Sequence, residues 1–132
     1  MNRVFVDTSA IVALINPLDE EHSRAVELFD RLAAAGSCLG STSYVLVETY
    51  ALLVRRLGID AARAFREDFE PLLELVWVEA DLHNSGLDLL LDRGNRRLSL
   101  VDAVSFLAIG RQEIDLVFAF DQDFDREGFA GV

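Results

Sequence analysis

The sequence predicts an α/β fold with three layers, α/β/α, around a mostly parallel central sheet. Two short apolar segments rich in β-branched and aromatic residues, 4–6 and 116–120, have the composition of buried strands. Segments with helical spacing of apolar residues separate the strand candidates, and this alternation is typical of parallel sheets covered by helices. The length of 132 residues suits one domain, so we expect a single domain over residues 1–132.

The first part of the chain alternates strand and helix candidates. Asp7-Thr8-Ser9 supplies helix N-cap side chains directly after the first strand, and Asn16-Pro17 ends the short helix that follows. Gly36 closes a second helix, in which Ala, Val, Phe and Leu recur at helical spacing. The predicted elements are a strand at 4–6, helices at 10–15 and within 19–35, and a weak strand at 37–40.

The second part of the chain is richer in helix signals. Thr42 or Ser43 can cap a helix that Gly58 closes, Asp60 caps another that ends before Pro71, and Ser99 caps a later one. The predicted elements are helices at 43–56, 60–70, 81–91 and 99–109, strands at 73–78 and 116–120, and a loop at 93–97. Residues 121–132 are predicted to be loop-like, with a short terminal element.

Composition narrows the class of partner. A formal net charge of −11 argues against broad non-specific binding to nucleic acid or to an anionic membrane. It does not exclude a nuclease, because bound metal ions supply positive charge that a formal count omits. The single cysteine cannot form an internal disulfide, which favours a reducing, cytoplasmic setting. No apolar run approaches the ~20 residues that span a bilayer, so we expect no membrane association.

Four acidic residues lie beside apolar segments: Asp7, Glu48, Asp102 and Asp121. A carboxylate in such a setting is unfavourable unless something pairs with it. The carboxyl ends of parallel strands meet at one edge of a sheet, where ligands gather, and Asp7 and Asp121 each follow a strand candidate. A hard divalent cation is a natural partner for converging carboxylates, so the pattern predicts metal-dependent chemistry on phosphate.

Each acidic residue also has a purely structural interpretation. Asp7 can cap the following helix, and Asp102 forms a capping-box-like pattern with Ser99. Asp121 can form an Asx-type turn after its strand, and Asp123 is a further candidate ligand or a solvated loop residue. Only the four carboxylates taken together favour a metal site.

Arginine is the only basic residue type with a positive charge at neutral pH, since the chain has no lysine. The cluster Arg93, Arg96 and Arg97 is the best candidate for contact with substrate phosphate, although a solvated loop is nearly as good an interpretation. Arg55-Arg56, at the end of a predicted helix, is explained by the helix dipole.

In this order, the acidic residues and their flanking segments resemble a PIN domain, and more narrowly the VapC family of toxin ribonucleases from type II toxin–antitoxin systems. The resemblance covers nearly the whole chain, and the ordered set is specific although its Asp-Thr-Ser element is common. The matching stretches are Val4-Phe5-Val6-Asp7-Thr8-Ser9-Ala10, Ser43-Tyr44-Val45-Leu46-Val47-Glu48-Thr49, Leu98-Ser99-Leu100-Val101-Asp102-Ala103 and Ala119-Phe120-Asp121-Gln122-Asp123-Phe124.

The resemblance implies an α/β/α fold, RNA cleavage that depends on Mg²⁺ or Mn²⁺, inhibition by a cognate antitoxin, and a homodimer. By motif position, Asp7, Glu48, Asp102 and Asp121 correspond to the family's acidic metal-binding and catalytic quartet. Thr8 or Ser9 matches a hydroxyl beside the first aspartate, with a predicted role in substrate binding. Many members carry Thr or Ser two residues before the last acid, where this chain has Ala119.

Three alternatives stay open at this point. One is a housekeeping PIN-domain nuclease without an antitoxin. Another is a metal-dependent phosphatase with Asp7 as nucleophile, although such enzymes commonly need a second carboxylate where this chain has Ser9. The third is a non-catalytic binding or signalling module, and a receiver-like version would need a lysine that the chain lacks.

Overall fold

The computed structural model describes residues 2–132, and its centre is a four-stranded sheet in the order β3-β2-β1-β4. The strands are β1 (Arg3–Val6), β2 (Cys38–Thr42), β3 (Leu73–Val76) and β4 (Leu116–Phe118). Every pairing is parallel, with Val4 opposite Leu39 on one side and Leu116 on the other. The predicted α/β fold with a mostly parallel sheet is therefore confirmed.

Seven α-helices connect and cover the strands over the described residues. They are α1 (Thr8–Ile15), α2 (His22–Ala34), α3 (Ser43–Leu57), α4 (Ile59–Ala64), α5 (Ala80–Arg93), α6 (Leu100–Arg111) and α7 (Gln122–Arg126). A π-helical turn, Phe65–Phe69, and a 3-10 turn, Glu70–Leu72, lead from α4 into β3. None of these helices has the length and apolar character required to cross a bilayer, as judged over residues 2–132.

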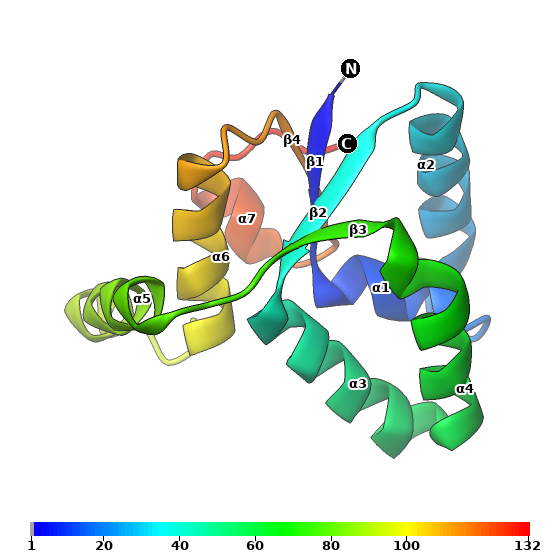
Figure 1. The fold of residues 1–132 in the computed structure, drawn as a ribbon, viewed down its shortest axis with the longest axis horizontal. Coiled ribbons are helices and arrows are strands. Elements are labelled where there is room, and N and C mark those ends of the chain that lie inside the picture. The colour runs from blue at the N-terminus through cyan, green and yellow to red at the C-terminus, as the bar shows by residue number, and fades with distance from the viewer. Residues whose placement is uncertain (1) are drawn as a thin grey trace.

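The helices form two layers around the sheet. Figure 1 shows α5, α6 and α7 on one side of the strands, and α1, α2 and α4 on the other. The chain leaves β1 and β2 at the same edge of the sheet, where α1 and α3 begin (Figure 1). Asp7 and the start of α3 are thereby brought to one end of the molecule.

Strand β1 lies between β2 and β4 and is buried on both faces, which explains its short apolar sequence. Val4 and Val6 have no exposed surface, and Phe5 is only 2% exposed. The ladder continues one residue past the strand, since the Asp7 N–H donates to the Phe118 carbonyl at 3.0 Å. This bond fixes Asp7 beside the end of β4.

Several elements differ in extent from the sequence prediction. The weak strand predicted at 37–40 is β2, a five-residue strand paired on both sides. The strand predicted at 116–120 ends at Phe118, and the segment predicted to be loop-like contains helix α7. Helix α7 forms because Asp121 caps it and Phe124, which is 2% exposed, packs edge-on against Phe106.

Candidate metal centre

Asp7 lies at the carboxyl end of β1 and caps helix α1, as its structural interpretation predicted. Its Oδ2 atom accepts hydrogen bonds from the Ser9 N–H at 3.1 Å and from the Ser9 hydroxyl at 2.7 Å. Only 4% of the residue is exposed. Burial raises the pKa of Asp7 to about 6, the Ser9 hydrogen bonds oppose this rise, and the charges of Asp102 and Glu48 add to it.

Asp102 enters the same region from the first turn of α6. It forms the predicted capping box with Ser99: its backbone N–H donates to the Ser99 hydroxyl at 3.0 Å, and its Oδ2 accepts from the Ser99 N–H at 3.2 Å. Burial raises the pKa of Asp102, and the nearby carboxylates of Asp121 and Glu48 raise it further, against the Ser99 hydrogen bonds. The capping role and a place in the acidic cluster therefore coexist in one side chain.

Asp121 and Asp123 extend the cluster beyond strand β4. Asp121 caps α7, with its Oδ1 accepting from the Asp123 N–H at 2.9 Å. One carboxylate oxygen from each of Asp102, Asp121 and Asp123 lies within 4.8 Å of the others, a spacing that could hold a metal ion. Burial and the Asp121 charge raise the pKa of Asp123, although Arg126 lies 3.4 Å away.

Glu48 completes the group from the second turn of α3. A single cavity of about 410 Å³ is lined by all four predicted quartet residues. Its lining consists of Asp7, Thr8, Ser9, Val12, Asp19, Glu48, Leu52, Arg56, Ser99, Asp102, Phe120 and Asp121. The convergence at one sheet edge that the sequence predicted is thus what the fold produces.

The chemistry of this donor set fits a divalent cation. Within residues 2–132, none of the four quartet carboxylates forms an ion pair. Four neighbouring carboxylates repel one another, and burial removes the water that would screen them. Hard, oxygen-only ligands are those that Mg²⁺ and related ions bind. The cavity can therefore accept a divalent cation together with a phosphate oxygen.

The two hydroxyls beside Asp7 are already engaged within the protein. The Thr8 hydroxyl donates to the Val45 carbonyl at 3.3 Å and is 3.1 Å from the Thr49 hydroxyl, which ties α1 to α3. The Ser9 hydroxyl donates to Asp7 and accepts from the Phe120 N–H at 2.9 Å. These contacts position the site, and a role in substrate binding stays a prediction for both residues.

The predicted arginine cluster does not line the acidic cavity. Arg93 forms a two-pronged ion pair with Glu127 and lines a separate cavity of about 300 Å³ that also contains Asp123 and Arg126. Arg96 and Arg97 are exposed, and neither side chain makes an ion pair within the part of the chain that the structure describes. Their contact with phosphate stays a prediction.

Arg56 is a cavity residue that the sequence prediction missed. Glu48, Leu52 and Arg56 are spaced by four residues on α3, so one face of the helix carries all three into the cavity. That spacing was the available signal, but two adjacent arginines before Gly58 were explained by the helix dipole alone.

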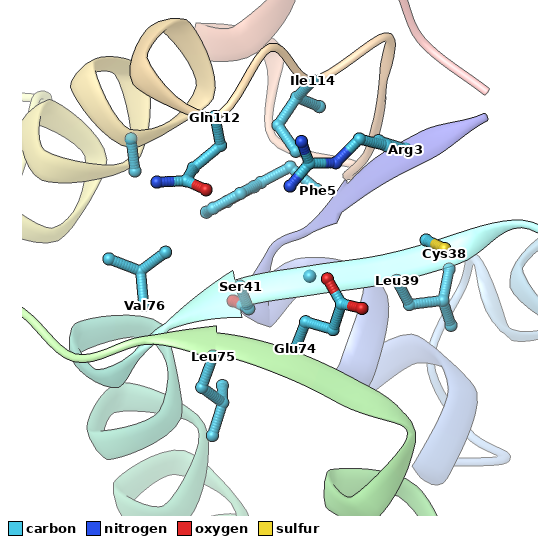
Figure 2. A pocket seen from close by; sticks show the side chains of 12 residues that line it. Arg3, Phe5, Cys38, Leu39, Ser41, Glu74, Leu75, Val76, Gln112 and Ile114 are labelled. Atoms are coloured by element: carbon cyan, nitrogen blue, oxygen red, sulfur yellow. The ribbon is translucent and has the colours of Figure 1, made fainter. Parts of the chain in front are cut away.

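A third cavity, of about 140 Å³, lies between the sheet and the end of α6 (Figure 2). Figure 2 shows Arg3, Phe5 and Gln112 along one side of it, with Glu74 on the opposite side. Its lining contains only one carboxylate, that of Glu74. This cavity therefore lacks the donor set of a metal centre.

Comparison with known proteins identifies the class of protein that has this fold and this acidic cavity. Residues 4–130 match the PIN domain. The match spans nearly all of the chain and includes every quartet residue. It leaves the phosphatase and receiver-like alternatives without support.

Individual relatives narrow the class further. The chain is 35% identical over 130 residues to the 23S rRNA-specific endonuclease VapC20 of Mycobacterium tuberculosis, covering 98% of this chain and 97% of the relative. The crystal structure of that VapC20, a Sarcin-Ricin loop cleaving toxin, matches with a TM-score of 0.84 and 36% identity over 98% of each chain. The chain belongs to the PIN-domain family and, within it, to the VapC group of endoribonucleases.

More distant structures share the fold alone. DNA-bound VapBC from Salmonella typhimurium matches with a TM-score of 0.68 and 18% identity, over 99% of this chain and 96% of that chain. VapBC2 from Rickettsia felis, bound to a promoter DNA fragment, matches with a TM-score of 0.67 and 16% identity, over 95% and 92%. The three-layer arrangement is therefore kept where little sequence is shared.

Proposed function

We propose that residues 1–132 form a single-domain, Mg²⁺-dependent endoribonuclease that acts as the toxin of a type II toxin–antitoxin pair. In this proposal Asp7, Glu48, Asp102 and Asp121 hold the cation, and Mn²⁺ can replace Mg²⁺. The observation that carries it is the convergence of these carboxylates in one cavity without an ion-pair partner within residues 2–132. Asp123 is a further ligand candidate, because its carboxylate lies next to those of Asp102 and Asp121.

The cation would contribute orientation and polarisation of a water molecule and neutralisation of charge on the scissile phosphate. The protein contributes the rest. Ser9 holds Asp7 through two hydrogen bonds, and Ser99 holds Asp102 through the capping box, so both carboxylates are oriented before substrate arrives. Pre-oriented groups lose little freedom on reaction, which lowers the barrier.

The proposed substrate is RNA in a single-stranded or loop region, whose backbone can enter a groove. The relative at 35% identity is a 23S rRNA-specific endonuclease, which makes 23S rRNA the first substrate to test. Arg96 and Arg97 are exposed and available for contact with more distant phosphates. Arg93 would have to leave Glu127 to do the same.

The proposed partners are a cognate antitoxin and a second copy of the chain, in the cytoplasm. An acidic cavity attracts an arginine or lysine side chain, which can neutralise the carboxylates in place of metal. Exposed apolar side chains on and after α3, among them Val47 at 68% and Ile59 at 58%, could receive an apolar helix. Solved neighbours include VapBC complexes, in agreement with a protein partner.

The test is RNA cleavage by purified wild type and Asp7→Asn, with Mg²⁺, with Mn²⁺ and with EDTA. We expect metal-dependent cleavage of 23S rRNA by the wild type and a loss on the order of ten-thousandfold or more in the variant, the scale for one member of a catalytic unit. Asp125→Asn is the matched control, because Asp125 is exposed on α7 and does not line the cavity.

Cleavage that persists in EDTA would contradict the metal requirement. Cleavage retained by folded Asp7→Asn would contradict the assignment of Asp7. A housekeeping nuclease would be favoured instead of a toxin if the protein is active, tolerated by its host at high expression and binds no basic partner on co-expression.

A further inference from the structure

Arg56 occupies a particular place relative to the acidic cluster. It lies in the last turn of α3 and lines the acidic cavity, eight residues after Glu48 and four after Leu52. At a rise of ~1.5 Å per residue, its Cα is about 12 Å along the helix axis from that of Glu48. The Arg56 backbone is therefore well separated from that of Glu48, while both residues line the same cavity.

Arg56 makes no ion pair within residues 2–132, although the cavity is lined by acids. Asp19, on the loop between α1 and α2, is the acid outside the quartet that lines the same cavity. The Asp19 Oδ1 atom accepts from the Glu21 N–H at 2.9 Å and is not paired with Arg56. Five of the other eleven arginines form ion pairs with acids, namely Arg24, Arg31, Arg93, Arg111 and Arg126.

The helix dipole alone does not explain this position. Arg55 and Arg56 are both basic residues in the last turn of α3, and both are exposed, so both interact with the carboxyl end of the helix. Only Arg56 lines the cavity. Comparing substitutions of Arg55 and Arg56 therefore distinguishes the general effect of a positive charge at the helix end from the specific effect of a positive charge at the cavity.

We propose that Arg56 is a substrate-binding residue whose guanidinium holds an RNA phosphate flanking the one that is cleaved. The inference rests on the proposed ribonuclease function and assigns part of its substrate site. A guanidinium presents parallel N–H donors that match two phosphate oxygens, and it keeps its charge at any working pH. Leu52, between Glu48 and Arg56 on the same face of α3, provides an apolar surface for the intervening ribose.

A contact between Arg56 and RNA phosphate would also explain how so acidic a protein can bind RNA. A chain with a net charge of −11 repels RNA unless cationic groups stand where the backbone passes. Within the cavity the quartet would be neutralised by metal, and Arg56 is the arginine in its lining. The RNA strand would thus run from the metal centre toward the carboxyl end of α3.

The experiment compares Arg56→Gln with Arg55→Gln. Cleavage of 23S rRNA is measured under steady-state conditions. Binding is measured in Mg²⁺ with a fluorescein-labelled RNA oligonucleotide that spans the wild-type cleavage position and carries a non-hydrolysable linkage there, so that the RNA stays intact and the quartet is unaltered. Both variants lose one arginine from the same helix turn, and thermal melting is compared to confirm that they fold equally well.

We expect Arg56→Gln to raise KM about tenfold with little change in kcat, the effect of removing a charged hydrogen bond made in ground and transition states alike. The plot of log affinity against log salt should become less steep by about 0.7, the value for one phosphate contact on a single strand. Arg56→Lys should keep the salt slope and recover part of the affinity. Arg55→Gln should match the wild type in every measurement.

Equal KM values and equal salt slopes for Arg55→Gln and Arg56→Gln would overturn the inference while leaving the nuclease assignment intact. A wild type that neither cleaves nor binds RNA in the presence of Mg²⁺ would overturn the proposed function itself. A fall in kcat with unchanged KM would also overturn the inference, because it would place Arg56 in the chemical step.

Discussion

Two neighbouring acidic regions of this protein handle charge in opposite ways. In the cavity at the ends of β1 and β4, Asp7 and Asp102 are buried beside other carboxylates, and burial raises the pKa of each. At the C-terminal end of α7, Glu127 accepts two hydrogen bonds from Arg93, which lowers the pKa of its carboxyl. The charge of Glu127 is balanced by an arginine of the protein, whereas the charges of the carboxylates in the cavity are not.

The difference shows what each region is suited to do. A carboxylate paired with arginine gains stability from the charge it carries and needs nothing from solution. A buried carboxylate with acidic neighbours is destabilising when charged, and a cation from outside removes that destabilisation. The unpaired region is therefore the one whose donor atoms fit a divalent cation, and three measurements can break or sharpen this contrast.

The largest expected effect is on the pH dependence of stability without metal. Burial raises the pKa of Asp7 from 3.8 to about 6, so the folded protein holds this proton more tightly than the unfolded chain. The Asp7 contribution to stability is then full below about pH 4 and is lost as pH rises through 6. At about 1.4 kcal/mol per pH unit, the loss by pH 7 is about 3 kcal/mol.

Asp7→Asn removes this titration and keeps an oxygen acceptor for Ser9. In EDTA, the variant should be more stable than the wild type at pH 7 and nearly equal to it at pH 4, as measured by urea unfolding. Glu127→Gln should behave in the opposite sense and lose stability at pH 7, because the pKa of Glu127 is lowered by Arg93. A pH-independent difference between wild type and Asp7→Asn would contradict the picture.

A slightly smaller effect is expected from metal. At a free Mg²⁺ or Mn²⁺ concentration of about 100 times Kd, binding to the folded state alone adds about 2.7 kcal/mol, or a rise in melting temperature on the order of 10 °C. Asp102→Asn should lose most of this response, since Asp102 belongs to both the quartet and the close acidic triplet. Glu127→Gln should keep it, and a wild type indifferent to either metal would count against a formed site.

The sequence predicted the convergence of the four acids better than it predicted the contacts around them. Asp7 and Asp121 follow apolar strand segments, and parallel strands end together, so their convergence could be inferred from pattern alone. Asp102 could be interpreted as a cap or as a site residue. The structure shows the cap together with a place in the acidic cluster, because its Oδ2 accepts the Ser99 N–H while it lies close to Asp121 and Asp123. Its role as a site residue stays a prediction.

The features that the sequence pattern did not predict depend on contacts between segments that are distant in the chain. From sequence alone, the Asp-Gln-Asp-Phe-Asp segment has the composition of a turn. In the folded protein Phe124 packs against Phe106, and this contact stabilises helix α7. Arg93 was predicted to contact phosphate, because its ion-pair partner Glu127 lies 34 residues away in the chain and could not be inferred from the local sequence. The Ser9 hydroxyl likewise meets the Phe120 N–H only after β1 and β4 have paired.

The smallest expected effect comes from Ser9, whose hydroxyl joins Asp7 to the chain after β4. Ser9→Ala removes the bond to Asp7 Oδ2 and leaves the Phe120 N–H without this acceptor, which should lower the free energy of unfolding by about 1 kcal/mol. Since the Ser9 hydrogen bonds lower the pKa of Asp7, the substitution should also move that pKa above its present value of about 6.

Carbon-13 NMR of the Asp7 carboxyl in metal-free protein measures this shift directly, and urea unfolding measures the stability. Ser9→Thr keeps the hydroxyl and should restore the titration of Asp7 toward that of the wild type. The unpaired region then differs from the Arg93–Glu127 pair in a further respect: its charges are restrained by neutral donors, which orient the carboxylates and leave them free to bind a cation. An unchanged Asp7 titration in Ser9→Ala would show that burial alone controls this carboxyl, and that the hydroxyl serves only to join β1 to β4.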